Sequence, residues 1–182
     1  MAISSAAQKI SDAAVLHFAE KGFDAGSLNA VAEMAGIKKA TIYSHFKNKD
    51  ELFIYVFEEA IAVESVFALQ CFSRDRHVGE CYLAQVTQRY QNSGHLRLLL
   101  RTAFIPPEGV REQVASGYEK FLAQLKSKFL AGLVDKDDKD MSMLAEAYLG
   151  IVDSVHVELL YATPVAAEIR RRSLWKLLSE AM

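Results

Sequence analysis

The sequence predicts an all-α protein, and three observations support this fold class. Hydrophobic residues make up 51% of the 182-residue chain, which is enough to bury a sizeable core. In most segments the apolar residues recur every three or four positions, the period of a helix, and no alternating β-type run stands out. The chain has only three prolines, so few segments are interrupted. We expect about nine helices.

The first predicted helix spans residues 4–21. Ile10, Ala14 and Phe18 follow one another at steps of four, which gives this helix a single apolar stripe. Gly22 is placed to end the helix, because glycine is common just after a helix C-terminus.

Two short helices joined by a tight turn are predicted next. Ser27 is a suitable N-cap for a helix that starts at Leu28. The turn falls at Ala35-Gly36, where glycine supplies the backbone freedom that a sharp corner needs. The following helix covers residues 39–46. Two helices in this arrangement form a helix-turn-helix, whose second helix enters the DNA major groove.

Residues 1–48 are thus predicted to form the helix-turn-helix domain. Residues 49–182 are predicted to form a larger helical domain for ligand binding and dimerisation. Asn48 and Glu51 have the spacing of a capping box at the start of a long helix that reaches about residue 72. Gly94 is expected to stop a later helix, and the run DKDDKD at 135–140 to form a solvated loop. Five further helices are expected at 80–92, 95–104, 108–133, 141–162 and 165–180.

Positive charge is concentrated at the front of the chain. Residues 1–49 carry six lysines and four acidic residues, whereas residues 50–182 carry fifteen basic and nineteen acidic residues. Four lysines fall within twelve residues that include no acid: Lys38, Lys39, Lys47 and Lys49. Binding to a polyanion would therefore have to be local, through this segment.

Several other function classes lack a sequence signal. There is no nucleophile elbow, phosphate-cradling glycine loop or HExxH motif, so we expect neither an enzyme nor a bound cofactor. Cys71, Asp75, His77 and Cys81 match no standard zinc spacing, so no metal is predicted. We expect structural thiols, with a redox sensor as the alternative. No apolar run reaches membrane-spanning length and no signal segment is visible, which predicts a cytoplasmic protein.

The front of the chain resembles a known family over roughly its first 55 residues. The residues that carry the resemblance are Ile10, Ala13-Ala14, Phe18, Gly22-Phe23, Ser27-Leu28, Val31-Ala32, Ala35-Gly36-Ile37, Thr41-Ile42-Tyr43, Phe46-Lys47-Asn48-Lys49 and Leu52. In this order they resemble the TetR (tetracycline-repressor-type) family of bacterial transcription regulators. Three positions depart from the residues that are frequent in the family. Ser27 replaces a threonine, Lys38 a small residue and Ala40 a glycine. These differences affect which DNA sequence is read.

The resemblance and the local charge together predict a DNA-binding surface. Its candidate residues are Ser27, Lys38, Lys39, Ala40, Thr41, Tyr43, Ser44, His45, Lys47 and Lys49. Lys47 and Lys49 lie beside a helix start and suit phosphate contacts, as does Ser27. By resemblance, Tyr43 contacts phosphate through its hydroxyl. The others are candidates for base edges, although His45 could equally bind phosphate. The alternative interpretation is a solvated basic face.

The second domain offers candidate ligand-binding residues without a diagnostic motif. They are Tyr90, Arg101, Phe104, Tyr118, Phe121, Tyr148 and His156. Aromatic rings at helical spacing line some ligand cavities but more commonly pack a core. Arg101 could grip an anionic ligand or belong to a solvated face, and His156 could contact a ligand or be a satisfied interior histidine.

The resemblance implies a ligand-responsive transcriptional regulator, and we expect a repressor that an unknown small molecule releases from a double-stranded DNA operator. It would act as a homodimer through the helices near 141–162 and 165–180, with its two reading helices about 34–36 Å apart. Two alternatives stay open. One is a DNA-binding factor without an effector, and the other is a helical small-molecule-binding protein that does not bind DNA.

Overall fold

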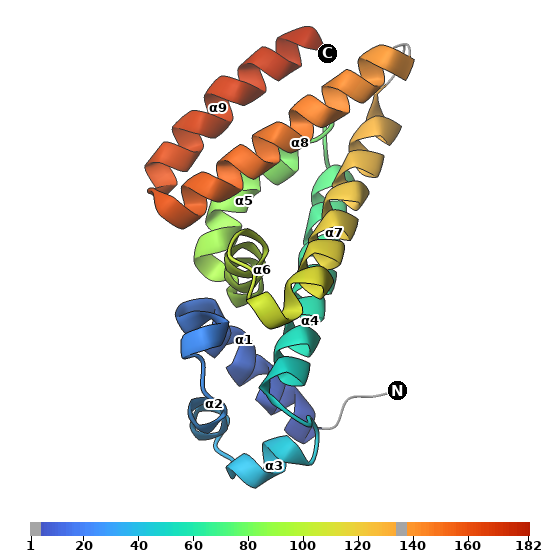
Figure 1. Cartoon of the computed structure of the whole chain (residues 1–182). Coiled ribbons are helices and arrows are strands. Elements are labelled where there is room, and N and C mark those ends of the chain that lie inside the picture. Colours follow the sequence, from blue (N-terminus) through green and yellow to red (C-terminus); the bar gives the residue numbers. More distant parts are fainter. Residues whose placement is uncertain (1–4, 134–137) are drawn as a thin grey trace. The chain divides into compact units, whose positions relative to one another are not determined.

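The computed structural model describes residues 5–133 and 138–182, and all regular structure in these ranges is helical (Figure 1). The predicted all-α class is confirmed. The described α-helices are α1 (Ser5–Ala25), α2 (Leu28–Met34), α3 (Lys39–Tyr43), α4 (Lys49–Phe72), α5 (Glu80–Asn92), α6 (Gly94–Phe104), α7 (Arg111–Gly132), α8 (Asp138–Tyr161) and α9 (Pro164–Ala181). A single 3-10 turn, η1 (Glu108–Val110), precedes α7. Among the described helices, none combines the length and hydrophobicity that a membrane span requires.

The chain forms two compact units. Unit 1 consists of Met1–Val63 and Ser93–Tyr118, and unit 2 of Glu64–Asn92 and Glu119–Met182. Helices α4 and α7 therefore contribute residues to both units. The predicted boundary between residues 48 and 49 divides the chain by function, whereas the two units divide it by contacts. The functional boundary stays a prediction.

Unit 1 is built around α1, which packs along α6 and against α2. Phe18 of α1 and Phe53 of α4 are buried and meet edge to face, with ring centroids 5.2 Å apart. Near the start of α6, a side chain at Gly94 would place its Cβ 3.0 Å from Leu16, so the two helices approach closely there. This core fixes the platform from which α2 and α3 project.

Unit 2 contains a hairpin of α8 and α9, with α5 packed against both helices (Figure 1). Thr163 caps α9 by accepting a hydrogen bond from the Ala166 N–H (3.1 Å), and Pro164 occupies the first helical turn, where its missing N–H costs nothing. The buried rings of Phe129 and Tyr148 stack with centroids 4.3 Å apart.

One glycine behaves as predicted and another does not. Gly22, with φ 76°, ends the first helical run of α1, and a second short run continues the element to Ala25. Gly94 does not stop a helix: it is the first residue of α6, and Ser93 caps that helix by accepting a hydrogen bond from the Leu96 N–H (3.2 Å). The serine hydroxyl supplies the cap that decides this boundary.

Two predicted segment boundaries also move. The helix expected at 108–133 begins with the 3-10 turn η1, and the α-helix starts only at Arg111. The loop expected at 135–140 lies partly outside the described residues, since 134–137 are not described, while 138–140 belong to α8.

Candidate nucleic-acid interface

The start of α2 is fixed by Ser27. Its backbone is extended, with φ −131° and ψ 129°, and its hydroxyl accepts a hydrogen bond from the Asn29 N–H at 3.2 Å. The side chain thus satisfies one of the free amide groups of the helix N-terminus. The predicted N-cap is confirmed, and the same hydroxyl lies on the exposed surface.

The turn between α2 and α3 has the geometry of a Schellman C-cap. The Gly36 N–H donates to the Glu33 carbonyl (3.1 Å), and the Ile37 N–H donates to the Ala32 carbonyl (3.0 Å). Gly36 has φ 66°, a left-handed conformation that is strained for residues with a Cβ. The chain therefore reverses sharply at Gly36 and leads into α3.

Helix α3 is shorter than the predicted 39–46 because it closes early. The Ser44 hydroxyl donates to the Thr41 carbonyl at 2.7 Å, and the His45 N–H reaches back only three residues, to Ile42. These bonds satisfy the last carbonyls of the helix. Ile42 of α3 and Phe46, just after it, are buried, so this segment turns one apolar face toward the core of unit 1.

A cap also fixes the start of α4. The Asn48 side-chain oxygen accepts a hydrogen bond from the Glu51 N–H at 2.8 Å, as the predicted cap requires. The Glu51 carboxylate accepts from the Lys47 N–H, one residue before the cap position. Lys47 is therefore held at a defined place beside the helix start.

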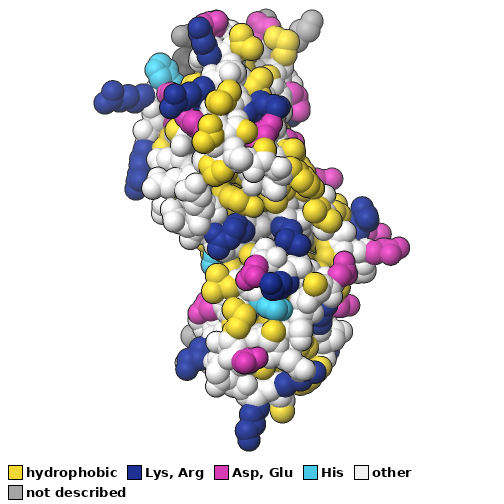
Figure 2. All heavy atoms as spheres, turned by 90° about the vertical axis from the view of Figure 1, so that its left-hand side faces the viewer, with side chains coloured by type: hydrophobic (Ala, Val, Ile, Leu, Met, Phe, Trp, Pro, Cys, Tyr) yellow, Lys and Arg dark blue, Asp and Glu magenta, His cyan; other side chains and the backbone are white. Residues whose placement is uncertain are grey.

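Most of the predicted DNA-binding side chains, which lie in and around α2 and α3, are exposed. The exposed members are Ser27, Lys38, Lys39, Ala40, Tyr43, Ser44, His45 and Lys47, whereas Thr41 and Lys49 are half-buried. Within the described residues, Lys38 and Lys47 take part in no ion pair. Lys and Arg side chains stand along the lower edge of the molecule in Figure 2. Their contacts with DNA stay a prediction.

Lys49 is placed differently from the other lysines. Its ammonium lies 4.2 Å from the centroid of the Phe23 ring and 3.4 Å from the Asp24 carbonyl oxygen. In this position it holds the segment that joins α1 to α2. A phosphate contact would require the side chain to leave this position.

His17 is a residue of this site that the sequence analysis missed. It is buried on α1, and its Nε2 accepts a hydrogen bond from the Ser27 N–H at 3.0 Å. Burial lowers the pKa of His17, which favours the neutral ring that can accept this bond. His17 thus fixes the N-cap residue of α2 against α1, and no spacing rule links two residues ten positions apart in this way.

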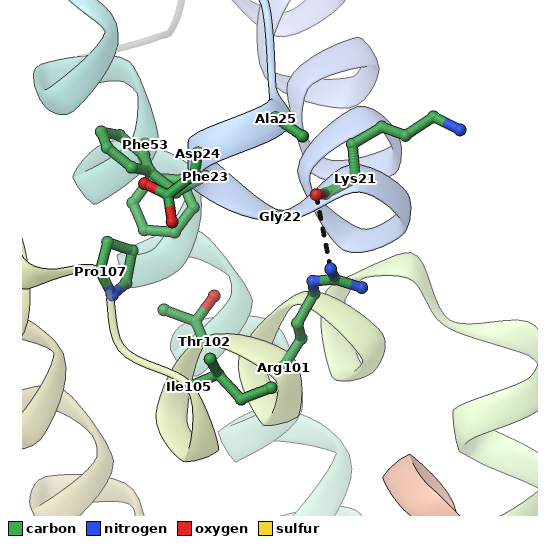
Figure 3. Close-up of a pocket in the computed structure, with 10 residues that line it drawn as sticks. All are labelled: Lys21, Gly22, Phe23, Asp24, Ala25, Phe53, Arg101, Thr102, Ile105 and Pro107. Carbon is green, nitrogen blue, oxygen red and sulfur yellow. Dashed lines mark hydrogen bonds between the residues drawn. The ribbon is translucent and has the colours of Figure 1, made fainter.

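The structure gives Arg101 a role inside unit 1. Its guanidinium donates to the Lys21 carbonyl at 3.4 Å, just before the break at Gly22 (Figure 3). It also donates to the Glu20 carbonyl at 3.3 Å. A Cβ at Gly22 would lie 2.9 Å from the Arg101 Nε. Arg101 lines a pocket of about 210 Å³ in this unit. It therefore joins α6 to the end of α1.

The other candidate ligand residues are divided between the two units. Phe104 and Tyr118 meet edge to face in unit 1, with centroids 5.8 Å apart. In unit 2, Phe121, Tyr148 and His156 are buried, and Tyr90 is half-buried. A pocket of about 600 Å³ in unit 2, beside the end of α4, has none of the seven candidates among its described lining residues. Their ligand-binding role stays a prediction.

Asp75 and the two cysteines form no metal site. The Asp75 carboxylate accepts hydrogen bonds from the Gly79 N–H (2.8 Å) and the Cys81 N–H (2.6 Å), so both oxygens have protein partners. In the described part of the chain, no group of three or more His, Cys, Asp or Glu side chains is arranged to hold a metal ion.

The front of the chain matches a known family model. Residues 10–56 match the model described as bacterial regulatory proteins, tetR family. Over 90 residues the chain is 38% identical to the HTH-type transcriptional repressor BdcR of Escherichia coli (strain K12), which covers 48% of this chain and 45% of BdcR. The match therefore spans less than half of that repressor.

Two solved structures share the fold over nearly the whole chain. The fatty acid degradation regulator FadR of Bacillus halodurans superposes with a TM-score of 0.73 at 17% identity, covering 96% of each chain. The transcriptional regulator FadR of Bacillus subtilis, in complex with stearoyl-CoA, superposes with a TM-score of 0.66 at 20% identity, covering 96% of this chain and 98% of that one. At these low identities the two superpositions show a common fold alone.

Proposed function

Because the chain belongs to the TetR family of bacterial regulatory proteins, we propose that it is a DNA-binding transcriptional repressor that a small molecule releases from its operator. The proposal rests most directly on the α2–turn–α3 unit. There the Schellman turn at Gly36 presents α3 with Ile42 packed inward and the lysines outward. Such a helix has the form that enters a major groove.

The position of each side chain on this surface indicates whether it would contact phosphates or base edges. Lys47 precedes the capped start of α4, and Tyr43 is 50% exposed at the end of α3. Both suit phosphate contacts that set the register of the protein on DNA. Lys38 is the N-cap position of α3 and Lys39 is its first residue, and residues at the N-terminus of a reading helix reach base edges.

A homodimer through α8 and α9 is part of the proposal, because this hairpin exposes large apolar side chains. Ile169 is 62% exposed and Leu177 is 66% exposed. Between the helices lies an apolar groove of about 570 Å³, lined by Leu144, Ile151 and Leu174 among others. Yellow side chains gather in the upper part of Figure 2, where the hairpin lies. Of the small residues in this region, Ala147 and Gly150 are exposed, whereas Ala145 is buried.

Covering such a face with a second copy would remove apolar surface from water and pair two half-site readers. Leu177→Asp should convert the dimer to a monomer in analytical ultracentrifugation, whereas Val66→Asp, at an apolar position of α4 that is 54% exposed, should not. A dimer that survives Leu177→Asp would place the interface elsewhere.

The small-molecule effector is supported by the shared fold. The similar FadR structure from Bacillus subtilis contains stearoyl-CoA, so this fold can hold a small molecule. We place the effector site in the helices from α4 onward. A thermal-shift screen tests this, because a ligand that binds only the folded state raises the unfolding temperature.

The decisive experiment measures binding to duplex DNA from the chain's own promoter region by fluorescence anisotropy. A duplex with two half-sites should bind two chains, and a duplex with one half-site should bind much more weakly. The Tyr43→Ala/Lys47→Ala variant should lose most of this affinity, whereas Lys120→Ala, at an exposed position of α7, should keep it. Equal affinity of all three proteins for any duplex would favour a helical protein that does not bind DNA.

A further inference from the structure

A small pocket in unit 1 lies where the end of α1 meets α4 and α6 (Figure 3). Its volume is about 210 Å³, and it is lined by residues 21–25 of α1, Phe53 of α4, Arg101 and Thr102 of α6, and Ile105 and Pro107 after α6. All of these residues belong to unit 1, and none of them lines the larger pocket in unit 2. The proposed function makes no use of this pocket.

We propose that this pocket binds a small organic acid, with one carboxylate on a compact apolar body, and that the bound acid weakens operator binding. The site itself does not depend on the proposed function, whereas its effect on DNA binding rests on that function. Three features of the pocket carry the inference: a buried hydroxyl without a partner, a guanidinium with unused donors, and apolar walls.

The first feature is the hydroxyl of Thr102. This residue is 3% exposed, and within the part of the chain that the structure describes its hydroxyl has no hydrogen-bond partner. Such a group is uncommon in a native protein, because a buried polar atom without a partner costs free energy. Figure 3 shows the Thr102 side chain pointing from α6 toward the end of α1. An acceptor on a ligand in the pocket would supply the missing partner.

The second feature is the guanidinium of Arg101, the residue before Thr102. Its bonds to the Glu20 and Lys21 carbonyls measure 3.3 and 3.4 Å, which is longer than a typical N–H···O hydrogen bond. These bonds use two of the five N–H groups of the side chain. Among the described residues, Arg101 has no ion-pair partner. The guanidinium therefore has both the charge and the donors that a carboxylate needs.

The charges around the pocket also favour a ligand with one negative charge. Besides Arg101, the charged lining residues are Lys21 and Asp24. Both are exposed and their charges are opposite, so the sum with half-buried Arg101 is one net positive charge. A planar guanidinium matches a carboxylate in geometry as well as in charge.

The apolar walls limit the rest of the ligand. The rings of Phe23 and Phe53 meet edge to face with centroids 4.9 Å apart, and Ile105 and Pro107 add aliphatic surface. Pockets for drug-sized molecules begin at about 300 Å³, so a pocket of about 210 Å³ suits a smaller molecule and excludes a long acyl chain. A monocyclic aromatic acid such as benzoate combines one carboxylate with a flat apolar ring of suitable size.

The bound acid would act on the DNA-binding segment through Arg101. A carboxylate is a stronger acceptor for a guanidinium than a neutral carbonyl, because its hydrogen bonds are charge-assisted. The ligand therefore draws the guanidinium away from its long bonds to Glu20 and Lys21, which hold the end of α1 before Ser27. DNA and the acid then favour different positions of this segment, so each lowers the affinity for the other.

The binding test titrates the full-length protein with sodium benzoate and follows the backbone amides by NMR. We expect saturable shifts centred on residues 20–25 and 101–105, with a Kd of about 1 mM or tighter. Neutral benzamide should bind about tenfold more weakly, because it cannot form charge-assisted bonds with Arg101.

Two matched variants test the role of the hydroxyl. Thr102→Val keeps the shape of the side chain, removes the donor and should weaken benzoate binding about tenfold. Thr87 of unit 2 also has a buried hydroxyl without a partner among the described residues, but it does not line the pocket. Thr87→Val should therefore bind benzoate like the wild-type protein.

The regulatory effect is measured on the promoter duplex with and without saturating benzoate. Sodium chloride at the same ionic strength is the reference, because salt itself weakens DNA binding. Operator affinity should be at least about fivefold lower in benzoate than in the matched chloride. The same benzoate concentration should have a smaller effect on Thr102→Val and the full effect on Thr87→Val.

Each outcome decides a different point. The absence of saturable shifts, or shifts away from the pocket, would overturn the site. Equal affinity for benzamide and benzoate would overturn the carboxylate, and equal benzoate affinity of Thr102→Val and the wild-type protein would overturn the role of the hydroxyl. Bound benzoate with unchanged operator affinity would overturn the regulatory effect. If the protein without benzoate binds no promoter duplex, the proposed function fails, and the NMR titration still tests the pocket.

Discussion

The hydroxyl of Tyr82 and Nε2 of His156 lie 3.1 Å apart inside unit 2, and both side chains are almost completely shielded from solvent. Burial raises the pKa of Tyr82 well above its ordinary value, so the phenol keeps its proton. Burial also lowers the pKa of His156 from 6.5 to about 3. His156 is thus neutral in the core and shares a hydrogen bond with the Tyr82 hydroxyl.

This pair makes stability depend on pH in a defined direction. Between pH 6.5 and about pH 3 the unfolded chain binds a proton at His156 that the folded chain does not bind. Stability therefore falls as the pH falls through this window, by about 1.4 kcal/mol per unit. Urea unfolding should give a free energy about 2 kcal/mol lower at pH 5 than at pH 7 from this residue alone. His156→Gln, which can still share a hydrogen bond with Tyr82, should remove that part of the difference. An identical pH dependence in both proteins would contradict the neutral buried histidine.

The stability of the turn before α3 should depend on the left-handed backbone of Gly36, and not on a lack of room for a side chain there. A Cβ at either Gly36 or Gly109 would meet no atom within 4 Å, but only Gly36 has a positive φ. Gly36→Ala should therefore cost about 1–2 kcal/mol of stability, and Gly109→Ala, as the matched control, close to zero. Gly36→Ala should also weaken operator binding, because the Schellman turn positions α3. Chemical denaturation of the two variants side by side checks this. Equal losses would show that the conformation of Gly36 does not matter.

Arg101 should support operator binding without touching DNA. Its bonds to the Glu20 and Lys21 carbonyls hold the end of α1, from which the segment to Ser27 continues. Arg101→Ala should weaken operator binding several-fold and speed amide exchange in residues 22–27. The salt dependence of binding should not change, because no phosphate contact is lost. Arg111→Ala, which also removes one exposed positive charge from unit 1, is the control. A changed salt slope in Arg101→Ala alone would mean that Arg101 contacts phosphate.

Local signals in the sequence were sufficient for much of the fold. The helical period located each described helix, and the caps at Ser27 and Asn48 followed from short-range hydrogen bonding that a few residues determine. The glycine at position 36 marked the turn because a left-handed conformation is a property of one residue. At Gly94, by contrast, the cap on the preceding serine outweighed the usual meaning of a glycine.

The contacts that connect distant residues could not be predicted. Arg101 and Lys21 are eighty positions apart, and Tyr82 and His156 seventy-four, so their meeting depends on how the helices pack. For Lys49 the sequence was misleading. Its position beside a helix start predicted a contact with a DNA phosphate, but in the folded chain its ammonium lies over the Phe23 ring.

The most direct test of the account is the salt dependence of operator binding by a Lys38→Ala/Lys47→Ala variant, compared with the wild-type protein and Lys120→Ala. Each phosphate contact contributes about 0.9 to the slope of log K against log salt concentration, and a dimer has every contact twice. Because Lys47 is assigned to phosphate and Lys38 to a base edge, the slope of the double variant should become less steep by about 1.8. Lys120→Ala should retain the wild-type slope. A double variant whose slope equals that of the wild-type protein would contradict the assignment of this surface to DNA.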